Sequence, residues 1–145
     1  MASTTFSGPV TSTNGFIGNL VGAVRVTHTA KAAINATATA TAAQVATGYI
    51  TSTSAAATVI TLPTGTLLGA ELGATQGTVL ELYVDNTAGV SLVTIAVATN
   101  GILSTAAADT AASFGDLTVA AGATGVARFT IMFSSPTAYV FTRTA

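Results

Sequence analysis

The sequence contains several stretches in which apolar and polar residues alternate, which is the pattern of a β-strand with one buried face. The clearest is Thr78–Asp85, where Leu80, Leu82 and Val84 fall on one face and more polar side chains fall on the other. We therefore expect this segment to be a strand whose aliphatic face covers a hydrophobic core.

A second long strand is predicted over Val126–Ser134. Phe129, Ile131 and Phe133 share one of its faces. Because large aromatic side chains bury the most apolar surface, we expect this face to carry much of the core.

Shorter segments rich in Thr, Val, Ile and Ala predict further strands, since such residues suit a pleated sheet. They are Ala23–Thr29, Asn35–Thr41, Tyr49–Thr53, Thr58–Leu62, Ser91–Ala98, Asp116–Ala120 and Tyr139–Arg143. Short strands separated by regular turn signals predict an all-β fold. We expect an antiparallel β-sandwich of the jelly-roll or Ig-like type.

The connections between strands carry turn residues. The sequence Asn86-Thr87-Ala88-Gly89 predicts a tight turn, so the strands over 78–85 and 91–98 are expected to form a hairpin. The Ala-rich stretch Ser104–Ser113 suits either a loop or a single helical turn.

Glycines recur every four residues at Gly65, Gly69, Gly73 and Gly77. This spacing suits a helix that packs closely against a neighbour. However, the segment is short, follows Pro63 and contains Glu71. We therefore favour a glycine-rich loop over Thr64–Gly77.

Residues 1–22 have too many Gly and Pro residues for a helix or a long strand. Phe6 and Phe16 lie in this stretch without a local core to bury them. We expect an extended N-terminal arm over 1–22 that becomes ordered against a partner, followed by a β-sandwich domain over 23–145.

Charge is scarce in this chain of 145 residues: only 6% of them are charged and the net charge is -1, against about a quarter charged in typical domains. A net charge near zero favours association, so we expect a homo-oligomer. The basic residues are spread along the chain, which excludes nucleic acid as an expected partner. The apolar runs are far shorter than the ~20 residues of a membrane-spanning helix, so no membrane partner is expected.

Candidate catalytic residues are few. His28 is the only histidine and there is no cysteine, so a zinc site or a Ser-His-Asp triad has no support, and we expect His28 to be a half-buried strand residue. Glu81 and Asp85 share one strand face at a separation of about 13 Å, too long for a glycosidase pair. We expect these carboxylates to form a solvated outer face that is paired with Arg128. No catalytic, metal-binding or cofactor-binding residue is predicted, and the protein is not expected to be an enzyme.

The segment from Phe6 to Asn19 reads FSGPV, two residues, then TNGFIGN. It resembles the N-termini of tailed-bacteriophage virion proteins, among them head decoration (cement) proteins and head or tail fibre proteins. Fibre relatives continue with repeated Gly-Asn/Asp-Val-Thr-Gly units, whereas only Gly18–Gly22 is loosely similar here. The resemblance therefore implies a compact protein on the capsid surface of a virion rather than a fibre shaft.

The function expected from this resemblance is capsid decoration: binding and stabilising the major capsid protein lattice, as a trimer. The candidate contacts with the capsid or a neighbouring protomer lie in the arm: Phe6, Pro9, Val10, Asn14, Phe16 and Ile17. The alternative is a head-fibre or tail receptor-binding domain that recognises a host glycan. An exposed aromatic cluster with carboxylates would favour that alternative.

Overall fold

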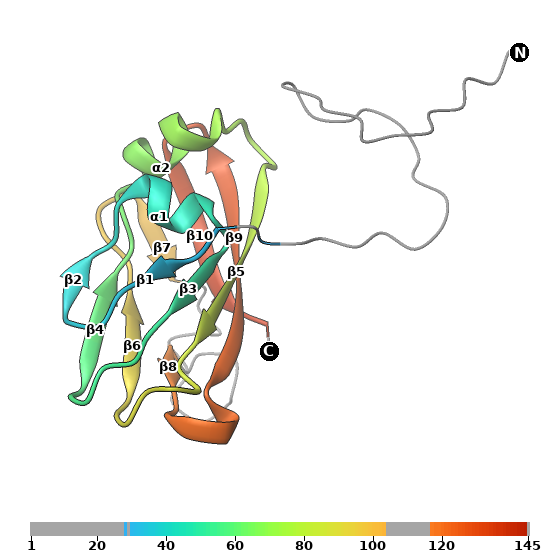
Figure 1. The fold of residues 1–145 in the computed structure, drawn as a ribbon. Coiled ribbons are helices and arrows are strands. Elements are labelled where there is room, and N and C mark those ends of the chain that lie inside the picture. Colours follow the sequence, from blue (N-terminus) through green and yellow to red (C-terminus); the bar gives the residue numbers. More distant parts are fainter. Residues whose placement is uncertain (1–27, 29, 104–116, 145) are drawn as a thin grey trace, which may run out of the picture.

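The computed structural model describes residues 28, 30–103 and 117–144 (Figure 1). The predicted arm over residues 1–22 and the domain boundary at residue 23 lie outside the described residues. So do Ala23–Thr29, apart from His28, and Ser104–Ser113.

The described residues form ten strands, two α-helices and one short 3-10 helix. In chain order these are β1 (Ala32–Ala33), β2 (Ala38–Thr39), α1 (Ala42–Ala46), β3 (Tyr49–Thr51), β4 (Thr58–Thr61), α2 (Gly65–Leu72), β5 (Val79–Asp85), β6 (Val93–Ala96), β7 (Gly101–Leu103), β8 (Thr118–Val119), η1 (Gly122–Thr124), β9 (Val126–Ser135) and β10 (Ala138–Arg143). The two long predicted strands, β5 and β9, are thus confirmed nearly to the residue.

The strands belong to two sheets, one with the order β1-β3-β5-β9-β10-β7 and the other with the order β2-β4-β6-β8. From β1 to β9, each strand lies in the opposite sheet from the strand before it. Strands β1, β3 and β5 pair in parallel, as do β2, β4 and β6, whereas β8 runs antiparallel to β6.

The prediction of an antiparallel all-β fold is therefore wrong in part. The fold is strand-rich, but five of the eight pairings between described strands are parallel. The predicted hairpin between 78–85 and 91–98 is also wrong, because β5 pairs with β3 and β9 while β6 pairs with β4 and β8. The turn at 86–89 carries the chain from one sheet to the other.

The two helices lie together at one end of the molecule, at the top of Figure 1. Helix α1 begins with a capping box in which the Gln44 N–H donates to the Thr41 hydroxyl and the Thr41 N–H donates to the Gln44 side chain. Helix α2 begins at a Thr64 cap and ends at Gly73, whose φ of 58° is left-handed. The expectation of a loop over Thr64–Gly77 is thus wrong for Gly65–Leu72. No helix in the described part of the chain is long and apolar enough to span a membrane.

One hydrophobic cluster joins the two sheets. Phe129, Ile131 and Phe133 are at most 1% exposed, as the alternation in β9 predicted. The Phe129 ring stacks on the Phe141 ring of β10 with centroids 5.0 Å apart. From β5, Leu82 and Val84 are fully buried and Leu80 packs at the edge of the cluster; from the second sheet come Ile60, Val93, Ile95 and Val119.

Candidate functional site

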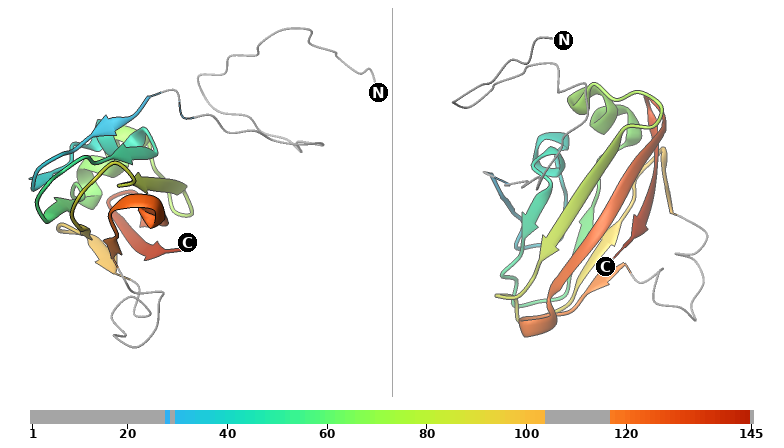
Figure 2. Two further views of the ribbon diagram at one scale, coloured as in Figure 1. Left: turned by 60° about the horizontal axis from the view of Figure 1, so that its bottom comes forward. Right: turned by 90° about the vertical axis from the view of Figure 1, so that its right-hand side faces the viewer.

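An open groove with a volume of about 660 Å³ lies on the outer face of the six-stranded sheet. Its floor follows β5, which lies beside β9 along its whole length (Figure 2). The residues that line it are His28, Tyr49, Val79, Leu80, Glu81, Tyr83, Asp85 and Val126. We call this the tyrosine groove. The same alternation that buries Leu82 and Val84 in the core turns the intervening side chains of β5 outward into the groove.

Three aromatic rings form one wall of the tyrosine groove. Tyr49 of β3 and Tyr83 of β5 are register partners on neighbouring parallel strands. The His28 ring lies against both, 5.6 Å from the Tyr83 ring and 6.3 Å from the Tyr49 ring. His28 Nδ1 is 3.0 Å from the Thr47 carbonyl oxygen; because a carbonyl only accepts, Nδ1 carries the proton in this contact. His28 is half-buried as predicted, but it lies in no strand.

At one end of the groove, Asp85 is held by three hydrogen bonds. One carboxylate oxygen accepts from the Thr87 hydroxyl at 2.6 Å and the Thr87 N–H at 2.9 Å, and the other accepts from the Tyr49 hydroxyl at 2.7 Å. These bonds, with a weaker attraction from Lys31, hold the pKa of Asp85 below its usual value. The same bond to Asp85, together with partial burial, raises the pKa of Tyr49. Asp85 thus stays ionised and fixes the position of the Tyr49 ring.

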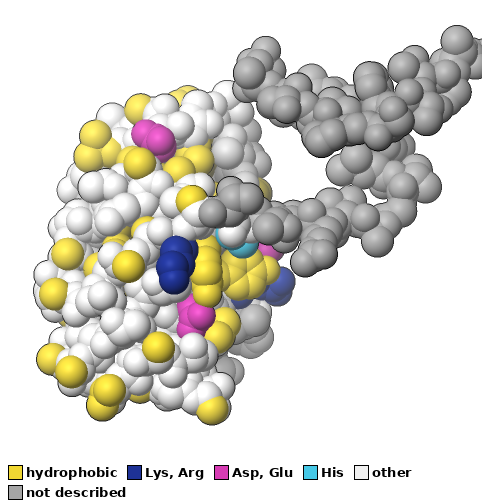
Figure 3. Space-filling view, viewed as in Figure 1, with side chains coloured by type: hydrophobic (Ala, Val, Ile, Leu, Met, Phe, Trp, Pro, Cys, Tyr) yellow, Lys and Arg dark blue, Asp and Glu magenta, His cyan; other side chains and the backbone are white. Residues whose placement is uncertain are grey.

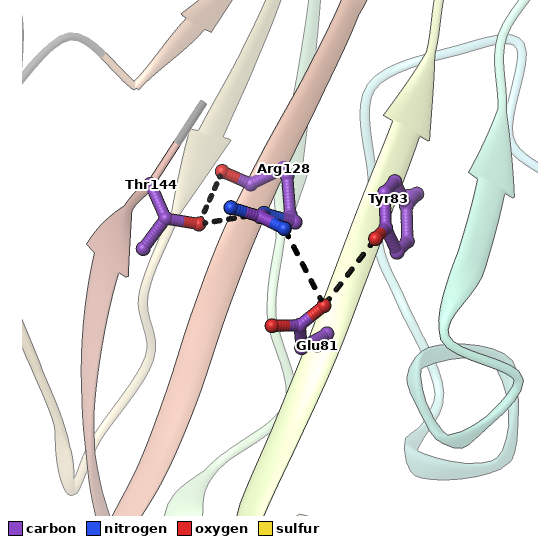
Figure 4. Close-up of polar contacts among 4 residues, drawn as sticks. All are labelled: Glu81, Tyr83, Arg128 and Thr144. Carbon is purple, nitrogen blue, oxygen red and sulfur yellow. Dashed lines mark hydrogen bonds and ion pairs between the residues drawn. The ribbon is translucent and has the colours of Figure 1, made fainter. Parts of the chain in front are cut away.

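Along the opposite side, Glu81 joins β5 to β9 (Figure 4). One Glu81 oxygen lies 3.9 Å from Arg128 Nη1 and accepts from the Tyr83 hydroxyl at 3.3 Å. Arg128 Nε in turn donates to the Thr144 hydroxyl at 3.3 Å. Of the carboxylate face predicted to pair with Arg128, Glu81 makes the contact, and the Arg128 and Glu81 side chains are 40% and 50% exposed. Such an exposed pair adds little to stability, so its main effect is to orient the two side chains.

In the described residues, charged side chains are concentrated around the tyrosine groove. Six Lys, Arg, Asp and Glu residues fall in the described part of the chain. Glu81 and Asp85 line the groove, Arg128 pairs with Glu81, and Lys31 acts on Asp85. Figure 3 shows apolar side chains beside the cyan histidine, with side chains of both charge signs around them. Four of the six charged side chains in the described residues thus lie around one groove.

Next to the groove, four apolar side chains form a row across the same outer face. Val79 of β5 is the register partner of Met132 in β9, which pairs with Val140 in β10, which pairs with Ile102 in β7. Val79 and Ile102 are 55% exposed and Met132 is 47% exposed. We call these four residues the apolar row. It is a contiguous patch of the kind that marks an interaction surface.

Within the described residues, no group of three or more His, Cys, Asp or Glu side chains lies close enough to hold a metal ion. The groove offers side chains that can bind and orient a ligand rather than an evident nucleophile paired with a base. Its hydroxyls and carboxylates bond mainly to one another.

The site differs from the one predicted. The six arm residues predicted as contacts, Phe6, Pro9, Val10, Asn14, Phe16 and Ile17, lie outside the described residues. Sequence reasoning placed Tyr83 on the outer face of its strand but missed the groove, because the approach of Tyr49 and His28 depends on parallel pairing that the alternation does not encode. One sequence signal could have indicated the groove: both tyrosines belong to strands and face outward. Tyr49 is the first residue of β3, and Tyr83 lies within β5.

Comparison with protein-family models, with curated proteins and with solved structures finds no match. The resemblance to phage virion proteins stays a prediction from the sequence.

Proposed function

We propose that this protein is a structural assembly protein, a capsid decoration protein of a tailed-bacteriophage virion, which uses the outer face of the six-stranded sheet as a contact surface. We further propose that its two sheets form a β-sandwich around their shared core. The observation that carries the proposal is the exposed apolar row, in a chain with 6% charged residues.

The free energy expected from burying the apolar row is that of a weak contact, of the kind repeated many times in a capsid lattice. Fully burying a Val, Ile or Met side chain contributes about 1.5–3 kcal/mol, so side chains already half covered gain about 1 kcal/mol each. The row as a whole would contribute about 3–4 kcal/mol, well below the ~8 kcal/mol of a micromolar complex. The row alone therefore does not hold an oligomer together at micromolar concentration, but it adds to the contacts expected from the arm between protomers, and on a capsid many symmetric copies act together.

The remaining parts of the proposal come from the sequence. The N-terminal segment resembles phage virion proteins, and its Phe6 and Phe16 need a partner surface. We expect the arm to bind the major capsid protein or a neighbouring protomer, and the protein to form a trimer at the capsid surface. Deleting residues 1–22 should then abolish particle binding and leave the rest of the chain folded.

The apolar row can be tested in the full-length protein by sedimentation equilibrium at micromolar concentration. The unchanged protein should be an oligomer, and Met132→Glu should shift it to monomer. The matched control is Leu67→Glu, which places the same charge on an apolar side chain of α2 that is 60% exposed and lies outside the row. A monomeric unchanged protein, or an equal effect of both variants, contradicts the role of the row.

The second candidate function is receptor binding, and the tyrosine groove favours it because aromatic rings and carboxylates meet there. Copy number separates the two functions. About one copy per capsid subunit in purified particles supports decoration, whereas only a few copies per particle supports a receptor-binding role.

A further inference from the structure

We infer that the tyrosine groove is a binding site for a neutral oligosaccharide. This inference goes beyond assembly through the apolar row, with which the groove shares only Val79, and it names a ligand class for the second candidate function, on which it rests. It is argued from the aromatic wall, from the pairing of β5 on both sides beside that wall, and from the balanced charges at the rim.

The floor of the groove excludes one common class of ligand. Strand β5 is hydrogen-bonded to β9 along its whole length and to β3 over Tyr83–Asp85, so beside the aromatic wall it is paired on both sides. A peptide that binds by adding a strand needs a free edge, which β5 does not provide over Tyr83–Asp85. A ligand at the aromatic wall is therefore recognised by side chains.

The aromatic wall suits sugar rings. Half-buried Tyr49 and Tyr83 lie side by side, with the His28 ring against both. The C–H face of a pyranose packs on an aromatic face, and binding sites commonly combine such apolar walls with a few fixed polar groups. Because the hydroxyls of both tyrosines are tied to carboxylates, the rings are held in place before a ligand arrives.

The polar groups at the rim match hydroxyl groups. Glu81 and Asp85 can accept hydrogen bonds, while Arg128 and Lys31 can donate them. These two negative and two positive side chains sum to zero charge. A phosphorylated or polyanionic ligand would need an excess of positive charge, which is absent here. A sugar needs donors and acceptors in equal measure and no net charge.

The length of the groove indicates an oligosaccharide rather than a single sugar. The lining runs from Val79 to Asp85, six residue steps along one strand. At about 3.3 Å per residue the groove is about 20 Å long. Several sugar rings can therefore lie along β5, with the aromatic wall two residues from the Asp85 end of the groove.

The test is binding of the full-length protein to a glycan array that holds the neutral oligosaccharides maltotetraose, cellotetraose, mannotetraose and chitotetraose together with sialylated and sulfated glycans. Each positive is then titrated by calorimetry. Tyr83→Ala should weaken binding at least tenfold, whereas Tyr83→Phe, which keeps the ring and loses only the hydroxyl, should weaken it less than about threefold. The matched control is Thr142→Ala, a half-buried position on the same sheet face, in β10, outside the groove lining. It should leave binding unchanged.

Thermal melts followed by circular dichroism establish that each variant is folded. Three results overturn the inference: no neutral glycan is bound, binding is confined to sialylated or sulfated glycans, or binding is unaffected by Tyr83→Ala. A synthetic peptide of residues 1–22 is included as a further probe. If only this peptide binds, and Tyr83→Ala removes its binding, the groove is a dock for the arm and the carbohydrate inference fails. Since Met132→Glu tests the apolar row, failure of either idea leaves the other standing.

Discussion

Gly69 of α2 faces the carbonyl oxygen of Pro136, in the turn between β9 and β10, so closely that a β-carbon at position 69 would overlap that oxygen. One turn earlier, a β-carbon at Gly65 would meet the backbone at Thr137 and would lie 2.7 Å from the Asn100 carbonyl oxygen. Both glycines are buried. Helix α2 thus lies directly on the backbone of the sheet end, and only glycine at these two positions permits that approach.

Gly69→Ala should therefore lower the free energy of unfolding by about 2–3 kcal/mol, although alanine is the better helix former. The added methyl group meets backbone, which cannot rotate away. Thr66→Ala is the control, because Thr66 is exposed in the same helix and should be neutral or slightly stabilising. Urea melts of both variants make the comparison. Equal midpoints for Gly69→Ala and the unchanged protein would mean that α2 does not pack on the turn as described.

Phe129→Ala should lower the free energy of unfolding by about 3–5 kcal/mol, the usual cost of deleting a buried aromatic ring. Phe129 is fully buried and stacks on Phe141. Thr130→Ala changes the next residue of β9, which faces outward and is only half-buried, and should cost less than about 1 kcal/mol. Thermal melts check both variants. An unchanged melting temperature for Phe129→Ala would mean that Phe129 faces solvent and that the alternate residues of β9 face the core.

The faces of the strands could be predicted from the sequence because alternation depends only on local geometry. Phe129 and Leu82 were assigned to the core correctly on that basis. The partners of the strands could not be predicted in the same way. The turn after Asp85 has the residues of a hairpin turn, yet the chain crosses there into the other sheet. A period of two says which way a side chain points and nothing about which strand lies beside it.

The glycine spacing in α2 was also ambiguous from sequence. The close-packing reading of Gly65 and Gly69 is the correct one, and the loop reading is wrong. The choice between the two readings depends on which part of the chain packs against the glycines. Here it is the turn at Pro136, about 67 residues further along the chain, which the local sequence does not reveal. The tyrosine groove was missed for the same reason, since it is made by register between β3 and β5.

Tyr139 should make the protein less stable at alkaline pH. Its ring is buried, its hydroxyl donates to the Pro63 carbonyl oxygen at 3.0 Å, and burial raises the pKa of Tyr139 to about 12. The unfolded chain loses this proton near pH 10 and the folded chain near pH 12. The stability contributed is therefore complete below pH 10 and declines between pH 10 and 12.

Tyr139→Phe removes both the hydrogen bond and this titration. At pH 7 the variant should be about 1 kcal/mol less stable, the net value of one buried hydrogen bond. Between pH 10 and 12 its stability should fall less steeply than that of the unchanged protein, so that the gap narrows. Urea melts at pH 7, 10 and 12 measure the difference. A constant gap across this range would mean that the Tyr139 hydroxyl is not buried.

Asn86 should be the least replaceable polar residue of the fold. It is fully buried at the end of β5, and its side-chain N–H groups donate to the carbonyl oxygens of Ser91, Val119 and Ala120 at 2.8, 3.3 and 2.9 Å. These bonds connect the end of β5 in the six-stranded sheet to two places in the other sheet: Ser91, just before β6, and the end of β8. Among the described side chains, its oxygen is the only buried polar atom without a protein partner.

Asn86→Asp should therefore be far more damaging at neutral pH than its small change in shape suggests, with a loss of at least about 3 kcal/mol. It replaces the donor by an oxygen that faces carbonyl oxygens, and it buries an unpaired charge. Burial should raise the pKa of the introduced carboxyl group, so the folded state keeps its proton when the unfolded state has lost it. The variant should then be most stable below about pH 4 and lose stability as the pH rises.

Asn86→Ala, which loses the same three bonds but adds no charge, should cost about 3 kcal/mol with no such pH dependence. Urea melts of both variants at pH 4 and pH 7 decide the matter. If the two variants lose equal stability at both pH values, the Asn86 side chain is not enclosed by the carbonyl oxygens of Ser91, Val119 and Ala120.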